Sequence, residues 1–187
     1  KTNAFKNGIN FTIYPGNLDL LNKELKNKFS FLPISSLINS KSFMCDEGYG
    51  LIEYTTDKFG FRNNNNIYQK KIDIVLIGDN FVHGSCVKDE DTLSGNLSKN
   101  YNVLNLGIGS SNPTHYSLII ENFLKYLEPK YLMIFVYSND YRYNPNSTFE
   151  KMLHNKKVIF NEQDISNGFP TKFSFEYIKN LNEIKKI

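Results

Sequence analysis

The stretch Ile74-Val75-Leu76-Ile77-Gly78-Asp79-Asn80-Phe81-Val82-His83-Gly84 decides the fold of this chain. It begins as an unbroken apolar run, which is typical of a parallel strand that is buried on both faces. The run stops at Gly78-Asp79, where a helix is predicted to begin. A strand that leads through a polar turn into a helix is the repeating unit of an open α/β sheet, and such sheets bind ligands at the carboxyl ends of their strands.

Similar units recur further along the chain. Residues 102–106 predict a second strand, which is closed by two glycines, and residues 131–137 predict a third buried strand. Between them, Asn112-Pro113 predicts the entry to a helix that runs to about residue 127. The order strand, helix, strand, helix, strand is the doubly wound pattern. We therefore expect an α/β fold, a flavodoxin-like three-layer α/β/α arrangement around a central parallel sheet.

The flanking sequence divides the chain into two predicted domains. Residues 1–70 show no βα alternation and predict an N-terminal extension, with a short helix over 18–29, a β segment over 51–56 and a polar linker that starts in the Asn run 63–66. Residues 71–187 form the α/β domain. Its last segment, Phe173–Ile187, is an amphipathic helix by its apolar periodicity. Because a doubly wound domain continues with another strand, we expect it to be incomplete at its C-terminal end.

Composition excludes several classes of function. The 187 residues carry a net charge of only +3, and their Lys residues are scattered, so no nucleic acid partner is expected. No apolar run reaches the ~18–20 residues that a membrane span needs. The glycines form neither a dinucleotide fingerprint nor a phosphate loop with Lys, so no cofactor is predicted, and no metal site either. Cys45 and Cys86 are either two buried thiols or one disulfide.

Each predicted strand ends in small or polar residues: Gly78-Asp79-Asn80, then Gly107-Ile108-Gly109-Ser110, then Ser138-Asn139-Asp140. Parallel strands would bring these ends to one edge of the sheet, where ligands bind in this architecture. The chemistry that suits such an edge is acyl transfer, with a nucleophile at a strand–helix turn and hydrogen-bond donors around it for the oxyanion.

These segments resemble the three conserved blocks of the SGNH (GDSL-type) hydrolases. The matching segments, for blocks I, II and III in turn, are Gly78–Gly84, Asn105–Ser110 and Tyr137–Asp140. Further segments resemble a bacterial subgroup that is associated with surface-polysaccharide gene clusters: Cys45–Gly48, Asp57–Asn63 and Gly84–Val87. The resemblance covers about residues 43–141. It also favours a disulfide between the two cysteines, although both alternatives, a disulfide and free thiols, stay open at this point.

The resemblance implies a role for each strand-end residue. Asn80 occupies the position of the nucleophilic Ser, whereas Ser110 and Asn139 occupy the oxyanion positions. The substrate-binding positions are Asp79, Gly109 and Asp140. The implied substrate is a small-molecule or glycan ester, a carboxylic ester or an acetyl group on a carbohydrate. The implied setting is a bacterial cytoplasm or periplasm.

Two departures from the family pattern predict that this chain does not catalyse the reaction. The carboxamide of Asn80 cannot replace a base-activated hydroxyl. The family's base lies in an Asp-X-X-His motif, and the 187 residues contain none; His115 and His154 are expected at the surface. The first hypothesis is thus an esterase-like domain that is inactive as written. The alternative is a non-catalytic relative that binds a glycan or acyl group. Asp79 has a second interpretation, as the cap of the following helix.

Overall fold

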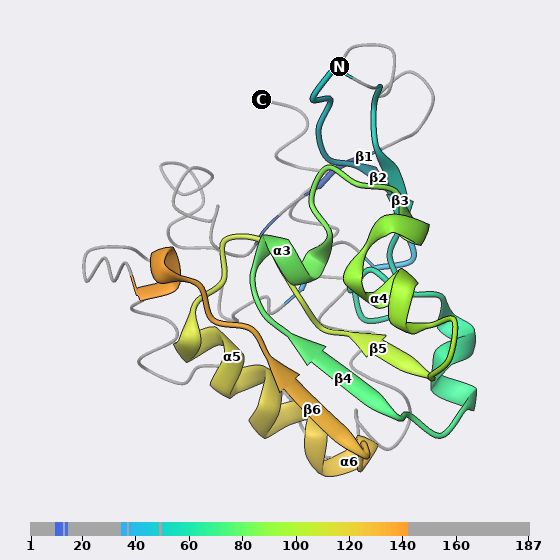
Figure 1. Cartoon of the computed structure of the whole chain (residues 1–187), viewed down its shortest axis with the longest axis vertical. Helices are drawn as coiled ribbons and strands as arrows, with labels where there is room; N and C mark the ends of the chain where they lie inside the picture. The colour runs from blue at the N-terminus through green and yellow to red at the C-terminus, as the bar shows by residue number, and fades with distance from the viewer. Residues whose placement is uncertain (1–9, 13, 15–34, 37, 49, 142–187) are drawn as a thin grey trace, which may run out of the picture.

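The computed structural model describes residues 10–12, 14, 35, 36, 38–48 and 50–141 (Figure 1). Its centre is a parallel sheet of three strands, β4 (Ile74–Ile77), β5 (Val103–Asn105) and β6 (Tyr131–Ile134), in the order β5-β4-β6. Ile74 lies opposite Val103 on one side and Tyr131 on the other. The predicted α/β class with a parallel sheet is therefore confirmed for the described residues.

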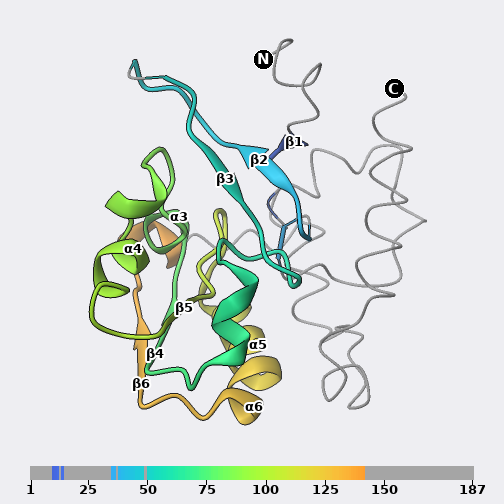
Figure 2. The ribbon, with the colours of Figure 1, turned by 90° about the vertical axis from the view of Figure 1, so that its right-hand side faces the viewer.

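Helices lie on both faces of this sheet (Figure 2). One face carries a continuous helical segment made of α5 (Pro113–Ile119), the π-helical η4 (Ile120–Leu124) and α6 (Lys125–Leu127). This segment confirms the helix that was predicted over 112–127. Asn112 caps it, since its side chain accepts a hydrogen bond from the His115 N–H at 3.1 Å. On the other face, Leu93 and Leu97 of α4 (Leu93–Leu97) pack near Ile74 and Leu76.

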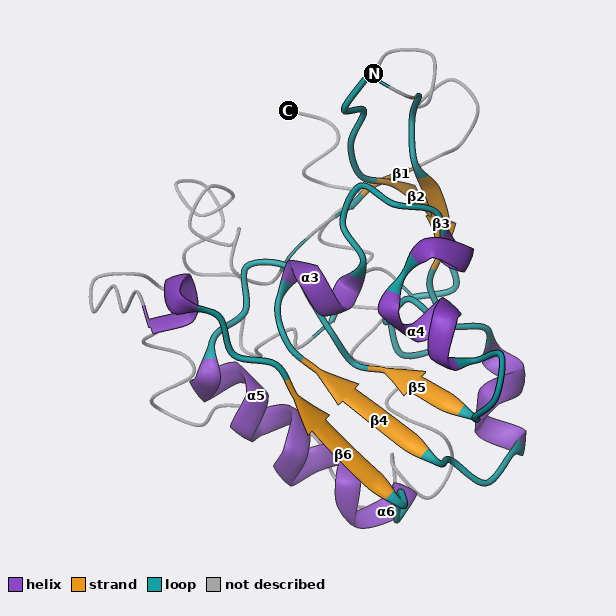
Figure 3. Cartoon of the chain, in the orientation of Figure 1, coloured by secondary structure: helices purple, strands orange, loops and turns teal. Residues whose placement is uncertain are grey.

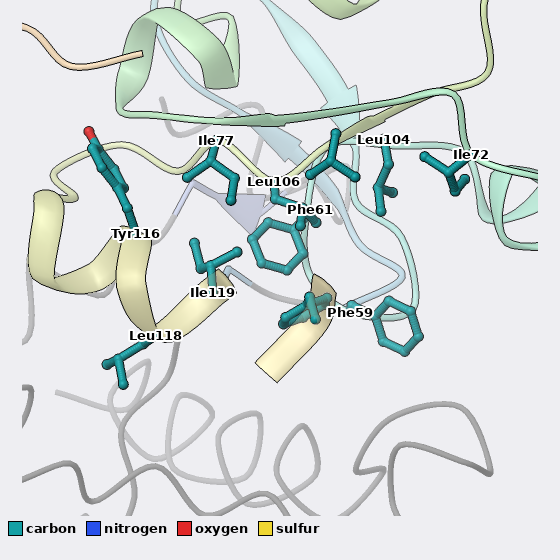
Figure 4. Packing of buried hydrophobic residues seen from close by; sticks show 11 residues of the cluster. Phe59, Phe61, Ile72, Ile77, Leu104, Leu106, Tyr116, Leu118 and Ile119 are labelled. Carbon is teal, nitrogen blue, oxygen red and sulfur yellow. The ribbon is translucent and has the colours of Figure 1, made fainter. Parts of the chain in front are cut away.

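The main core lies under the α5 face (Figure 4). Val75, Ile77, Leu104 and Leu106 point from the sheet and its strand ends into a cluster that also contains Ile119 and Phe123 of the helical segment. The cluster includes two residues from before residue 71, Phe59 and Phe61. Phe61 is fully buried, with its ring edge-on to Phe123 at a centroid distance of 5.3 Å. Residues on both sides of position 71 therefore share one core.

A second sheet packs beside the first (Figures 1 and 2). Its strands are β1 (Asn10–Phe11), β2 (Lys41–Phe43) and β3 (Glu53–Thr55); β1 pairs with β2 in parallel and β2 with β3 antiparallel. The β segment predicted over 51–56 is confirmed as β3. The helix predicted over 18–29, the segment Phe173–Ile187 and His154 lie outside the described residues.

The Asn run was expected to be a linker, and this prediction is wrong. Residues 65–69 form the 3-10 helix η2 (Asn65–Gln69), which Asn64 caps. Asn63 joins the chain before it to β5: its Nδ2 donates to the Asn105 carbonyl at 2.9 Å, and its Oδ1 accepts from the Asn105 N–H at 2.8 Å. A polar side chain can thus pair with the backbone at the edge of a sheet. The polar composition of the Asn run does not reveal such a pairing.

The turn from Asp57 to Asn63 holds the two sheets together. The buried Asp57 carboxylate accepts hydrogen bonds from the N–H groups of Phe59 and Phe61 and from the side chains of Asn63 and Tyr68. Burial raises the pKa of this carboxyl to about 6, although each of the four donors lowers it. The side chain of Arg62, in the same turn, contacts residues 84–89, which follow helix α3 (Asn80–His83).

The third strand was predicted to be buried, and it is not. Tyr131, Leu132 and Ile134 of β6 are exposed, as are the three apolar residues after it, Phe135, Val136 and Tyr137. Within the described residues β6 is an edge strand, paired only with β4, and the helical segment leaves much of it open. An apolar run alone cannot distinguish a central strand from an edge strand, because burial depends on what packs against it.

Cys45 and Cys86 form a disulfide with a Cα–Cα distance of 5.4 Å, so the alternative of two separate thiols is wrong. The bond joins the hairpin between β2 and β3 to the segment after the first strand end. In the described part of the chain, no helix has the length and apolar character needed to span a bilayer.

Candidate functional site

The three strand ends lie at one edge of the sheet, because all three strands run in the same direction. Helix α3 (Asn80–His83) begins where β4 ends, the loop after β5 passes beside it, and β6 leads to the 3-10 helix η5 (Ser138–Tyr141) (Figure 3). The Gly78 carbonyl connects the first two ends. It accepts hydrogen bonds from the Ile108 N–H at 3.0 Å and from Ser111 Oγ at 3.2 Å.

Asp79 caps helix α3. Its Oδ1 accepts a hydrogen bond from the Phe81 N–H at 2.9 Å, and its Oδ2 is buried with no hydrogen-bond partner. Burial raises the pKa of this carboxyl, and the nearby negative charge of Asp140 raises it further. The capping interpretation of Asp79 is therefore confirmed.

Asp140 organises the third strand end in the same way. Its buried Oδ2 accepts hydrogen bonds from the Tyr137 N–H at 2.8 Å and from the Tyr116 hydroxyl at 3.0 Å. Burial raises the pKa of Tyr116, so this hydroxyl stays protonated and remains a donor. Nothing in the sequence pointed to this hydrogen bond, because Tyr116 and Asp140 are 24 residues apart.

The three residues that were predicted to occupy catalytic positions are not engaged in this way. Asn80 is half-buried, Ser110 and Asn139 are exposed, and none of their side chains makes a hydrogen bond within the described residues. Ser110 has φ +60°, in the left-handed region that favours glycine. Two carboxamides and a hydroxyl are therefore available to an external ligand.

Gly109, expected to bind substrate, is buried under the ring of Tyr14. A Cβ atom at Gly109 would lie 2.5 Å from Tyr14 Cε1, so a larger residue would require the Tyr14 ring to move. No sequence signal pointed to Tyr14, because it lies far from the three blocks. The structure thus assigns to Gly109 a packing contact with the N-terminal segment.

His83 is fully buried between tyrosine rings rather than presented to the cleft. It lies edge-on to Tyr14 and Tyr54, at centroid distances of 5.7 and 5.3 Å, and neither ring nitrogen has a hydrogen-bond partner. Burial and the positive charge of Arg62 lower its pKa to about 3. The imidazole is neutral at physiological pH. His115 was expected at the surface but is also fully buried, because it faces inward from the first turn of α5.

Arg62 fixes the chain that follows α3. Its Nη1 donates to the Gly84 carbonyl at 2.6 Å and its Nη2 to the Val87 carbonyl at 2.9 Å, and Nε pairs with Asp89 at 2.7 Å. Gly84, at φ +80°, ends α3. The buried guanidinium thereby binds the C-terminal end of the helix carrying Asn80 and the segment that follows it.

One open cavity of about 460 Å³ lies away from the strand ends. It is an open polar groove between η2, α4 and the β5 edge, and its lining includes Asn66, Lys70 and Ser98, which are all exposed. Arg62, which also lines it, is already paired with Asp89. We therefore place the candidate site at the strand ends. Within the described residues, no group of three or more His, Cys, Asp or Glu side chains is arranged to hold a metal ion.

No family model, curated protein or solved structure matches the chain.

Proposed function

We propose that this chain is an SGNH-type, flavodoxin-like domain whose strand-end site binds the acyl group of a carboxylic ester, such as an acetyl group on a carbohydrate, without cleaving it. The observation that carries the proposal is the contrast between the two sets of strand-end residues. Asp79 and Asp140 are buried, and each accepts a backbone N–H through one carboxylate oxygen. The side chains of Asn80 and Asn139 remain available at the same edge, and carboxamides can donate to an acyl oxygen.

Absence of hydrolysis follows from the chemistry of residue 80. Acyl transfer by this route requires a hydroxyl oxygen from which a base removes a proton. Asn80 has no such oxygen, and the nearest histidine in the sequence, His83, is buried and faces Tyr14 and Tyr54. The resemblance in three blocks supports the ancestry, and the available amides support the retained binding.

The test separates binding from turnover. We expect the chain to hydrolyse p-nitrophenyl acetate no faster than a protein-free blank. Ethyl acetate, titrated into ¹⁵N-labelled protein, should shift the side-chain amide signals of Asn80 and Asn139. Asn139→Ala should weaken that response, whereas Asn66→Ala, which removes an exposed amide on η2, should leave it unchanged. Turnover that disappears in Asn80→Ala would contradict the loss of catalysis. Equal responses of Asn139→Ala and Asn66→Ala to ethyl acetate would contradict the location of the site.

The disulfide supports the periplasm over the cytoplasm as the setting of this function. Disulfides persist in oxidising compartments and are rare where thiols are kept reduced. We expect Cys45 and Cys86 to resist a thiol-alkylating reagent in unreduced protein from cells and to react after reduction. Alkylation of both without reduction would argue for the cytoplasm.

A further inference from the structure

Two exposed aromatic rings lie together at the strand-end edge of the sheet. Phe81 is 63% exposed and Tyr137 is 55% exposed, and they are the two most exposed large apolar side chains among the described residues. Phe81 belongs to α3 and Tyr137 follows β6, so the rings come from different strand ends. They nevertheless touch, with a centroid distance of 5.1 Å and an interplanar angle of 53°. The pair is therefore a tertiary feature.

The two buried carboxylates position this pair. Asp79 binds the Phe81 N–H and Asp140 binds the Tyr137 N–H, at 2.9 and 2.8 Å. Each aromatic residue is thus held at its backbone while its ring extends into solvent. Exposed apolar side chains that gather in one place commonly mark a binding surface. Both anchoring carboxylates are buried, and each accepts a backbone N–H through one oxygen.

Polar groups of the site flank each ring. Asn80 directly precedes Phe81, and Asn139 lies two residues after Tyr137. A ligand that covers the two rings would therefore meet apolar ring faces with amide donors and acceptors nearby in the chain. Pyranose sugars have this combination, because their axial C–H groups form an apolar face and their hydroxyls surround it. A simple acyl chain offers no hydroxyls for the amides, and an anion would find no unpaired cation among these residues.

We infer that Phe81 and Tyr137 are specificity-determining residues that stack on a pyranose ring and so select an acylated carbohydrate over a simple ester. The inference rests on the proposed function, since the acyl group of the same ligand would lie at Asn80 and Asn139. The aromatic pair contacts the sugar ring, and the two amides bind the acyl group.

Two probes separate these two roles in the full chain. Methyl β-D-glucopyranoside has a pyranose ring and no acyl group, whereas ethyl acetate has an acyl group and no ring. Each is titrated into labelled protein and followed by NMR. We expect the glucoside to shift the signals of Phe81 and Tyr137, and we expect Phe81→Ala and Tyr137→Ala each to weaken its binding about fivefold, a typical effect of losing one aromatic contact. Ethyl acetate binding should not change in these variants.

The matched control is Tyr101→Ala. Tyr101 is also exposed but precedes β5, at the opposite end of the parallel strands. This variant should bind the glucoside like the unchanged chain, and Tyr137→Phe should retain binding because the ring remains. The inference is overturned if the glucoside does not bind, or if Phe81→Ala and Tyr101→Ala change its binding equally. Either result overturns it even if ethyl acetate binds. Loss of ethyl acetate binding alone overturns the proposed function instead.

Discussion

Arg62 offers the sharpest test of how this structure is held together. Its side chain is 4% exposed, and its guanidinium bonds two backbone carbonyls, of Gly84 and Val87, in addition to Asp89. We consider Arg62→Met, which keeps an unbranched apolar stem and removes all the donors. The two carbonyls then lose their partners in a place that water reaches poorly.

The expected loss follows from these contacts. A hydrogen bond from a charged donor contributes about 1.5–3 kcal/mol, and removal of one partner leaves the other unsatisfied. The pair with Asp89 adds little, since the Asp89 side chain is 63% exposed and solvent screens it. We therefore expect Arg62→Met to lower the free energy of unfolding by about 4 kcal/mol. Arg62→Lys retains a charge but not the fork of donors, and we expect a loss of about 2 kcal/mol.

The assay is urea unfolding at pH 7 without reductant, followed by far-ultraviolet circular dichroism. Asp89→Asn is the matched control, because its amide oxygen can still accept from Nε, and it should cost less than about 1 kcal/mol. A loss below 1 kcal/mol for Arg62→Met, or equal losses for Arg62→Met and Asp89→Asn, would refute the view that the backbone contacts stabilise this region.

Three further predictions concern the rest of the chain. Replacing both Cys45 and Cys86 by Ser opens a loop with a sequence separation of 41 and should cost about 4 kcal/mol by the chain-entropy estimate, measured by urea unfolding; an unchanged midpoint would contradict it. His83 has a folded pKa of about 3 against an unfolded value of 6.5, so as the pH falls from 7 to 4 the unfolded state gains a proton that the folded state does not. On going from pH 7 to pH 4, the unfolding free energy should therefore change by about 3 kcal/mol more unfavourably in the unchanged chain than in His83→Phe. Asp57 contributes in the opposite direction, but it does so in both proteins and cancels in the comparison. Equal changes in the two proteins would refute burial of a neutral imidazole. Phe61→Ala should cost about 3–5 kcal/mol because the ring is fully buried, whereas Phe81→Ala, which removes an exposed ring, should cost less than about 0.5 kcal/mol; the reverse order in thermal unfolding would refute the core assignment.

The local elements of the sheet could be predicted because their signals are local. The unbroken run before Gly78 predicts β4, and Asn112-Pro113 predicts the start of α5 through a side-chain cap and a fixed φ. Asp79 as a helix cap is of the same kind, because the bond from the Phe81 N–H spans two residues.

Other predictions failed because they depended on distant partners. Asn63 looked like part of a linker until its pairing with Asn105, 42 residues away, was seen. Tyr131–Tyr137 looked buried because its apolar character matched that of β4, yet within the described residues it forms the edge of the sheet. His115 looked superficial because a single polar residue in a helix does not reveal which face it occupies.

The sequence by itself determined the order of strands and helices, the turns that end them and the identity of the residues at each strand end, because hydrophobic periodicity and capping act over a few residues. Only the tertiary structure decided that Cys45 and Cys86 pair, that Tyr14 covers Gly109, and that the rings of Phe81 and Tyr137 meet while two buried carboxylates hold their backbones. The physical reason is that burial, electrostatic coupling and ring contact depend on separation in space, and residues distant in sequence become neighbours only when the chain folds.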